Sequence, residues 1–137
     1  MGKISGPLLD RVDIHIEVPA VPFEELSSRD ASSETSAMMR ESVMRARDVQ
    51  AERFEGSPIR YNAQMSSRQT RQHCELSAAS KTLLKAGVES LGLSARAHDK
   101  ILRVARTIAD LAGDPDISEE HLAEAIGYRN LDADLWV

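Results

Sequence analysis

The stretch LSARAHDKILRVARTIADLAG, from Leu93 to Gly113, decides how the rest of the chain can fold. Its apolar residues recur at intervals of three and four, which predicts a helix that buries one face. Ser94 is a suitable N-cap, and Gly113, followed by Asp114 and Pro115, is a suitable C-terminal stop. The residues predicted to face the core are Ile101, Val104, Ala105, Ile108, Leu111 and Ala112.

Arg96 lies in the first turn of this predicted helix. A cation at that end is opposed by the helix dipole by roughly 0.3–1 kcal/mol. A phosphate would meet both the free N–H groups of the first turn and the guanidinium. The alternative is that Arg96 folds back onto a neighbouring carboxylate, and the spacing by itself favours this alternative because surface arginines are usually inert.

The composition indicates a folded, mainly helical chain. Its 137 residues are 42% apolar and 28% charged, which is typical of a globular domain. Aromatic residues make up 4%, which favours helix packing over a β-sandwich. The net charge of −5 argues against a generic nucleic-acid binder, and Cys74 is the single cysteine, so an internal disulfide is excluded.

The sequence shows no sign of a membrane location. No apolar run approaches the ~20 residues that a membrane-spanning helix needs, and the N-terminus lacks the apolar region of a signal peptide. We therefore expect a cytoplasmic chain with no membrane partner.

Residues 12–18 alternate between apolar and polar side chains, which predicts a half-buried β-strand with His15 on its solvated face. The sequence downstream offers this strand no partner, and one strand cannot satisfy its own backbone groups. We therefore expect it to belong to the sheet of a larger α/β protein whose other strands are missing here. In the isolated chain it should be disordered, packed on the helices or paired with another copy.

A connector rich in Ser, Glu and Pro follows, from Ala20 to Ser36, and leads into a helix predicted to end near Phe54. The side of this helix predicted to be buried carries Met39, Val43, Ala46, Gln50 and Phe54. The side predicted to be solvated carries Arg40, Arg45, Arg47 and Arg53.

Three further helices are predicted from their caps. Ser66 and Gln69 form a capping-box pattern before a short helix that ends near Cys74. A helix capped by Ser77 and stopped by Gly92 is predicted to pack through Ala79, Leu83, Leu84 and Val88. The last helix opens after Ser118 and runs to about Arg129. The fold class is therefore mainly α, a small helical bundle preceded by one strand.

The motifs of self-contained active sites are missing from the sequence. There is no GxxxxGK[ST] phosphate loop, no HExxH, no GxSxG and no cluster with metal-ligand spacing. Two arginines stand out by position: Arg96, at the start of the central helix, and Arg11, at the start of the predicted strand.

Three stretches together resemble a known family: KISGPLLDRVDIHIEV at residues 3–18, NAQMSSRQTRQHC at 62–74, and the central helix. They are similar to the C-terminal part of the magnesium-chelatase-like AAA+ ATPases, the ComM/YifB family, up to about Asp132. The resemblance implies residues 1–18 as the end of an AAA+ core, 19–62 as linker and long helix, 63–132 as a helical lid domain, and 133–137 as a tail.

The resemblance also implies roles for the two arginines. Arg11, in the LLDR motif, would be the arginine finger that reaches the γ-phosphate in a neighbouring subunit, and Arg96, in the SAR motif, would be the sensor-2 residue that contacts ATP. It further implies a ring, with six subunits expected, in which this chain contacts its own AAA+ core, and an activity of DNA branch migration. ATP and Mg²⁺ are implied for the full-length protein, and no metal site is expected in this chain.

Two classes of function remain open at this point. One is the lid of a motor ATPase that acts through Arg96 and Arg11. The other is a helical module that binds DNA or a protein without nucleotide. The predicted strand favours the first, and because the phosphate loop is missing, this chain by itself is expected neither to bind nor to hydrolyse ATP measurably.

Overall fold

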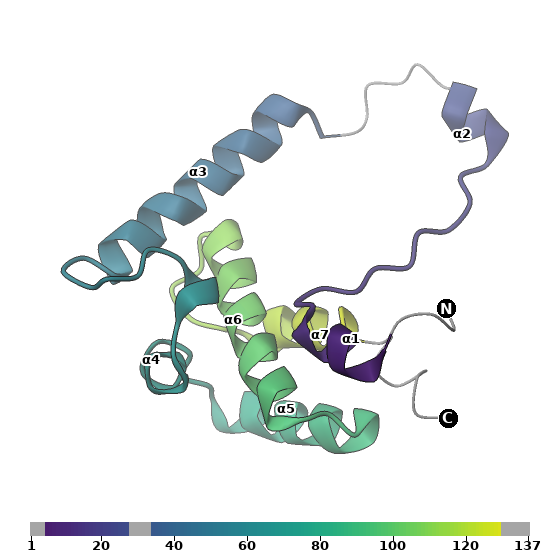
Figure 1. Ribbon diagram of the computed structural model, residues 1–137. Coiled ribbons are helices and arrows are strands. Elements are labelled where there is room, and N and C mark those ends of the chain that lie inside the picture. The colour runs from purple at the N-terminus through teal and green to yellow at the C-terminus, as the bar shows by residue number, and fades with distance from the viewer. Residues whose placement is uncertain (1–4, 28–33, 130–137) are drawn as a thin grey trace.

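The computed structural model describes residues 5–27 and 34–129, and over these ranges the chain is built from helices (Figure 1). Over these ranges none of the helices is both long and apolar enough to cross a bilayer. The expected tail at 133–137 lies outside the described residues. In chain order the helices are α1 (Gly6–Arg11), α2 (Phe23–Ser27), α3 (Ser36–Arg53), the 3₁₀ turn η1 (Asn62–Gln64), α4 (Ser67–His73), α5 (Ala78–Leu91), α6 (Ala95–Ala112) and α7 (Glu119–Gly127).

Helix α6 forms the centre of the bundle, as its sequence predicts. Helices α3, α4 and α7 and the turn η1 pack against it, and α5 packs against α7. Gly87 lets α5 and α7 approach closely, because a Cβ at this position would lie 3.0 Å from the Cδ1 of Ile126 and would push that side chain aside. The core consists of Phe54, Met65, Cys74, Leu84, Ile101, Leu102, Ala105, Ala109, Ile117, Leu122 and Ala125.

The caps predicted from the sequence are confirmed. The hydroxyl of Ser94 accepts a hydrogen bond of 3.1 Å from the amide of Ala97, and Gly113 closes the helix in a left-handed conformation with φ of 76°. Ser66 and Gln69 form the reciprocal capping box at the start of α4. Local sequence therefore fixes where most of these helices begin and end.

The buried face of α6 is broader than predicted. Ile101 and Ala105 are buried, but Leu111 and Ala112 are exposed, and Leu102 and Ala109 are buried instead. The prediction assumed one apolar stripe, whereas neighbours pack on α6 from α3, α4 and α7. Ala79 of α5, also predicted to be buried, is exposed.

The predicted strand over residues 12–18 is not seen. The segment is extended, but no strand is assigned among the described residues, and the side chains of Ile14, Ile16 and Val18 are exposed. His15, which is predicted to lie on the solvated face, is instead buried, with 6% of its surface exposed. The physical reason is that the described residues provide no neighbouring strand, so the segment rests on the bundle through His15 instead.

Helix α3 is attached to the bundle at its C-terminal end and extends away from it (Figure 1). Ala46, Gln50 and the cap residue Phe54 are buried as predicted, while Met39 and Val43 are exposed. Contacts with the core therefore hold the second half of α3, and its first half presents apolar side chains to solvent.

A buried polar cluster makes this attachment, and we call it the Asp110 hub. Arg53 donates two hydrogen bonds to the Asp110 carboxylate, of 2.7 and 2.8 Å, and Asn62 donates a third of 2.8 Å. The Arg106 Nε lies 3.3 Å from the same carboxylate, and the backbone amide of Asn62 donates to the Gln50 side chain. The side chain of Arg53 is 13% exposed, so its predicted place on a solvated face is wrong.

Candidate functional site

Arg96 is the second residue of α6, and its side chain is exposed at the N-terminal end of the helix. No carboxylate of the described residues lies within ion-pair distance of its guanidinium. The alternative of an arginine folded onto a neighbouring acid is therefore not what the described part of the chain shows. Among the described residues no partner occupies the N–H donors of the Arg96 guanidinium, which are suited to an anion.

A carboxylate already lies at this helix terminus, and it comes from α1. The Ser94 hydroxyl donates a hydrogen bond of 2.7 Å to the Oδ1 of Asp10 while it accepts from the amide of Ala97. An anion near the first turn is stabilised by the helix dipole. Asp10 thus offsets part of the unfavourable placement of Arg96. Sequence reasoning missed it because 84 residues separate the two partners.

Arg11 is the last residue of α1, directly after Asp10, and its side chain is exposed. The backbone carbonyl of Arg11 accepts a hydrogen bond of 3.0 Å from the Nζ of Lys100 on α6, and Lys100 also forms an ion pair with Asp13. These contacts hold the C-terminal end of α1 against α6. The side chain of Arg11 itself remains exposed to solvent.

The segment that follows Arg11 is held by α7 and the residues after it. The guanidinium of Arg129 donates to the carbonyl of Val12, and the amide of His15 donates to the carbonyl of Tyr128 at 2.7 Å. The His15 ring is also within hydrogen-bond distance of the Leu9 carbonyl, at 3.0 Å. Residues 5–15 are therefore docked on the bundle, one of the outcomes expected for this segment in isolation.

The structure thus places Arg11 and Arg96 on two segments that touch at one end of α6. The contact runs through Asp10 and Ser94, one and two residues away from the arginines. No described hydrogen bond joins the two guanidinium groups to a shared partner. Both arginines can therefore reach outward from the same region of the molecule.

One turn further along α6, Asp99 joins this end of the helix to α4. Its carboxylate accepts a hydrogen bond of 2.7 Å from the Ser67 hydroxyl and contacts His98. Burial disfavours the charged form, but the hydrogen bonds from Ser67 and His98 and the positive charge nearby outweigh it and hold the pKa of Asp99 below its usual range. Asp99 is therefore ionised at neutral pH, and its carboxylate is already in contact with Ser67 and His98.

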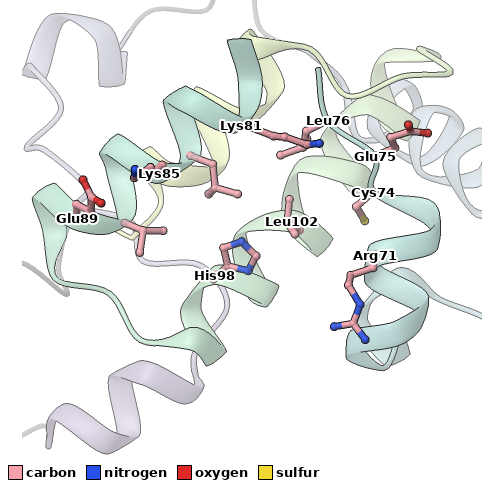
Figure 2. A pocket seen from close by; sticks show the side chains of 11 residues that line it. Arg71, Cys74, Glu75, Leu76, Lys81, Lys85, Glu89, His98 and Leu102 are labelled. Atoms are coloured by element: carbon pink, nitrogen blue, oxygen red, sulfur yellow. The ribbon is translucent and has the colours of Figure 1, made fainter. Parts of the chain in front are cut away.

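A hollow of about 620 Å³ opens between α4, α5 and α6 (Figure 2). Arg71 and Cys74 line one side and Lys85 and Glu89 of α5 the other, with Leu102 between them. Burial raises the pKa of the Cys74 thiol to about 11, so this sulfur acts as an apolar group rather than a nucleophile. The remaining lining residues are Glu75, Leu76, Lys81, Leu84, Val88 and His98.

The described residues do not assemble a metal centre, since no group of three or more His, Cys, Asp or Glu side chains among them is placed to hold an ion. The cationic side chains of Arg11 and Arg96 suit an anionic group instead. A guanidinium is a donor suited to the oxygens of carboxylate or phosphate groups.

Comparison with known proteins gives the chain a family. Residues 33–129 match the family model described as "Magnesium chelatase, subunit ChlI C-terminal". The chain is 43% identical over 129 residues to competence protein ComM of Haemophilus influenzae, and 39% identical over 132 residues to the uncharacterized protein YifB of Escherichia coli. These alignments cover 94% and 96% of the chain but 25% of each relative.

A more distant relative, the uncharacterized protein Rv2897c of Mycobacterium tuberculosis, is 34% identical and shows the same pattern, with 97% of this chain and 26% of the relative aligned. The chain thus spans about a quarter of the length of the curated relatives that it matches. The resemblance read from the three sequence stretches is confirmed, and the chain belongs to the magnesium chelatase ChlI C-terminal family, as the C-terminal region of the ComM/YifB magnesium-chelatase-like proteins.

Proposed function

We propose that this chain acts as the helical C-terminal domain of a ring-forming AAA+ ATPase, in which Arg96 contacts the phosphates of bound ATP. The observation that carries the proposal is the exposed guanidinium of Arg96 at the start of the central helix, with no ion-pair partner among the described residues. Family membership supports it, because the chain aligns with one quarter of much longer relatives.

In this proposal Arg96 recognises the negative charge of the ATP phosphates. A guanidinium is planar and can donate two parallel hydrogen bonds to phosphate oxygens, which a lysine cannot do. ATP with Mg²⁺ would supply the phosphoryl group, and the loop that holds it would come from outside this chain. Arg96 would then bind those phosphates and tie the position of α6 to the nucleotide state.

Arg11 is proposed to act on the neighbouring subunit of the ring as an arginine finger. Its exposed side chain follows a helix end fixed by Lys100 and by the contact between Asp10 and Ser94. An arginine supplied in trans stabilises charge on the transferring phosphoryl group. The ring is proposed to have six subunits, and coupling to DNA branch migration is proposed on the family resemblance.

Steady-state ATPase measurements on the full-length protein test this proposal. Arg96→Ala is expected to lower turnover roughly a hundred-fold, the effect of one lost charge-stabilising donor, and Arg11→Ala by about a thousand-fold or more. Arg96→Lys should recover only part of the activity. Arg40→Ala is the matched control, since Arg40 is exposed on α3 without a described partner.

Mixing the two inactive variants separates action within a subunit from action across the boundary. If Arg11 acts in trans and Arg96 in its own subunit, mixed rings contain some intact sites and regain part of the turnover. Wild-type turnover in Arg96→Ala, with an unchanged melting temperature, would contradict the proposal and leave Arg96 as an ordinary surface arginine.

A further inference from the structure

We propose that Asp10 and Ser94 are positioning residues, which hold Arg11 and Arg96 at a fixed separation through the hydrogen bond between their own side chains. The inference rests on the proposed function, because it gives these two residues a part in the turnover that the arginines would support. Neither Asp10 nor Ser94 is proposed to touch ATP, so both act through the arginine beside them.

The place of this hydrogen bond relative to the two arginines is the first observation. Asp10 directly precedes Arg11 at the end of α1, and Ser94 is the N-cap two residues before Arg96. The Ser94 hydroxyl lies 2.7 Å from the Oδ1 of Asp10. A change in this contact would therefore shift the backbone within one residue of Arg11 and within two residues of Arg96.

The Ser94 hydroxyl forms two hydrogen bonds at once. It accepts from the amide of Ala97 at 3.1 Å and donates its proton to the Asp10 carboxylate. A hydroxyl has one proton and two lone pairs, so it can form both bonds together. The first bond caps α6, and the second joins the start of α6 to α1. The two roles of Ser94 can therefore be separated by substitution.

A second contact turns this bond into a two-point attachment. Lys100 lies six residues after Ser94, about 9 Å along α6 by the helix rise. Its Nζ donates a hydrogen bond of 3.0 Å to the carbonyl of Arg11 and forms an ion pair with Asp13. A single contact would let α1 pivot against α6, whereas two contacts at separate points on α6 limit that rotation.

The backbone on either side of Arg11 is also held. Leu9 is buried, with 7% of its surface exposed, and the carbonyl of Val12 accepts a hydrogen bond from the guanidinium of Arg129. The side chain of Arg11 is exposed nevertheless. A fixed backbone that carries a free guanidinium is the arrangement needed to place one charged group accurately relative to another.

The charge of Asp10 has a second effect on the two arginines. Like charges on segments in contact repel each other, and the positive end of the α6 dipole also opposes Arg96. Neither guanidinium has an ion-pair partner among the described residues. A carboxylate at this helix end counters both effects, so Asp10 favours the placement of two cations in one region.

Electron paramagnetic resonance on this chain tests the positioning directly. Nitroxide labels are attached after Arg11→Cys and Arg96→Cys in a Cys74→Ala background, and a narrow distribution of label distances is expected. Ser94→Asp should widen this distribution, because a carboxylate still caps α6 but has no proton to donate and repels Asp10. Ser94→Asn also caps α6 and offers N–H donors to Asp10, so it should keep the distribution narrow.

Steady-state kinetics of the full-length protein test the consequence for turnover. Ser94→Asp is expected to lower kcat by about ten- to a hundred-fold, the effect of a small misplacement, with a smaller change in KM. Ser94→Asn should retain most of the activity. Combining Asp10→Ser with Ser94→Asp exchanges the hydroxyl and the carboxylate, so the hydrogen bond can form again and part of the lost kcat should return.

Glu17→Ala is the matched control, since Glu17 is an exposed acid of the same N-terminal segment without a described partner. It should change neither the label distances nor kcat. Thermal melts establish that each variant is folded, and the cap kept by both Ser94→Asp and Ser94→Asn makes their stabilities comparable.

Unchanged label distances in Ser94→Asp would overturn the inference, as would an equal loss of kcat in Ser94→Asp and Ser94→Asn. An exchanged pair that recovers none of the lost kcat would also contradict it. Wild-type turnover in Arg96→Ala contradicts the proposed function itself. An inactive Arg96→Ala beside a fully active Ser94→Asp contradicts this inference alone.

Discussion

Helices α3 and α6 have the same length, 18 residues, and are held in opposite ways. Seven residues of α6 are buried, spread from Ala97 to Asp110, whereas two residues of α3 are buried, both in its second half. Five of the seven buried residues of α6 are apolar, so mainly apolar packing on several sides fixes α6, whereas contacts near one end fix α3. The comparison teaches that helix length says little about how a helix is attached.

At the end of α3 the attachment is polar. The Asp110 carboxylate is fully buried and receives three hydrogen bonds, two from Arg53 and one from Asn62. The Arg106 guanidinium also donates to the carbonyls of Asp114 and Pro115, both at 3.0 Å. The hub thus joins α3, η1, α6 and the loop before α7 through one acid.

The largest expected effect comes from breaking this hub. Asp110→Asn keeps the shape of the side chain but leaves the charges of Arg53 and Arg106 buried without their partner. Removing one member of a buried ion pair costs about 3–5 kcal/mol. We expect a loss of that size in the free energy of unfolding, measured by urea denaturation, and faster amide exchange in α3.

Asp48→Asn serves as the matched control for this change, because Asp48 lies on the exposed surface of α3. Its effect should stay within about 0.5 kcal/mol. A loss below about 1 kcal/mol in Asp110→Asn would mean that apolar contacts of Phe54, and not the hub, hold α3 in place.

A second pair of substitutions sharpens the contrast in apolar packing. Ile101→Ala removes a side chain that is fully buried in α6, and such truncations cost about 2–5 kcal/mol. Val43→Ala removes an exposed side chain from α3 and should change the stability by about 0.5 kcal/mol or less. Thermal melts of both variants check the difference, and equal losses would show that the first half of α3 is packed in solution.

Local signals in the sequence carried most of the helix prediction. Ser94, Gly113 and the capping box at Ser66 mark helix ends through contacts within three or four residues, so they can be read without knowledge of the fold. The alternation over residues 12–18 failed as a strand signal because a strand also needs a neighbour, and the described residues provide none.

The candidate site was predictable only in part, for a related reason. The positions of Arg11 and Arg96 were found through a helix start and a family resemblance. The contact between Asp10 and Ser94 spans 84 residues, and the ion pair between Arg53 and Asp110 spans 57. Long-range polar pairs leave no periodic trace in a sequence, so neither could be predicted.

The smallest expected effect is the pH dependence of stability contributed by His73, the last residue of α4. The pKa of this ring depends partly on the charges of the Asp110 hub. The His73 ring contacts the Phe54 ring edge to face, with centroids 5.4 Å apart. Burial, followed by the positive charges of Arg53 and Arg106, lowers the pKa of His73 below its ordinary value of 6.5. The neutral ring is thus the form that the folded state favours.

The sign of the effect on stability follows from this direction. Because its pKa is lower in the folded state, the unfolded chain binds more protons at this site between the two pKa values. The contribution of His73 is therefore complete above about pH 6.5, the unfolded value, and is lost as the pH falls below it toward the folded pKa. His73→Gln should lose less stability than the wild type between neutral and mildly acidic pH, as measured by urea denaturation.

In Asp110→Asn the charges of Arg53 and Arg106 lose their balancing acid, so an NMR titration of the His73 ring should show its pKa lowered further. An unchanged ring pKa in that variant would mean that burial by itself sets the protonation of His73 and that the hub does not reach it.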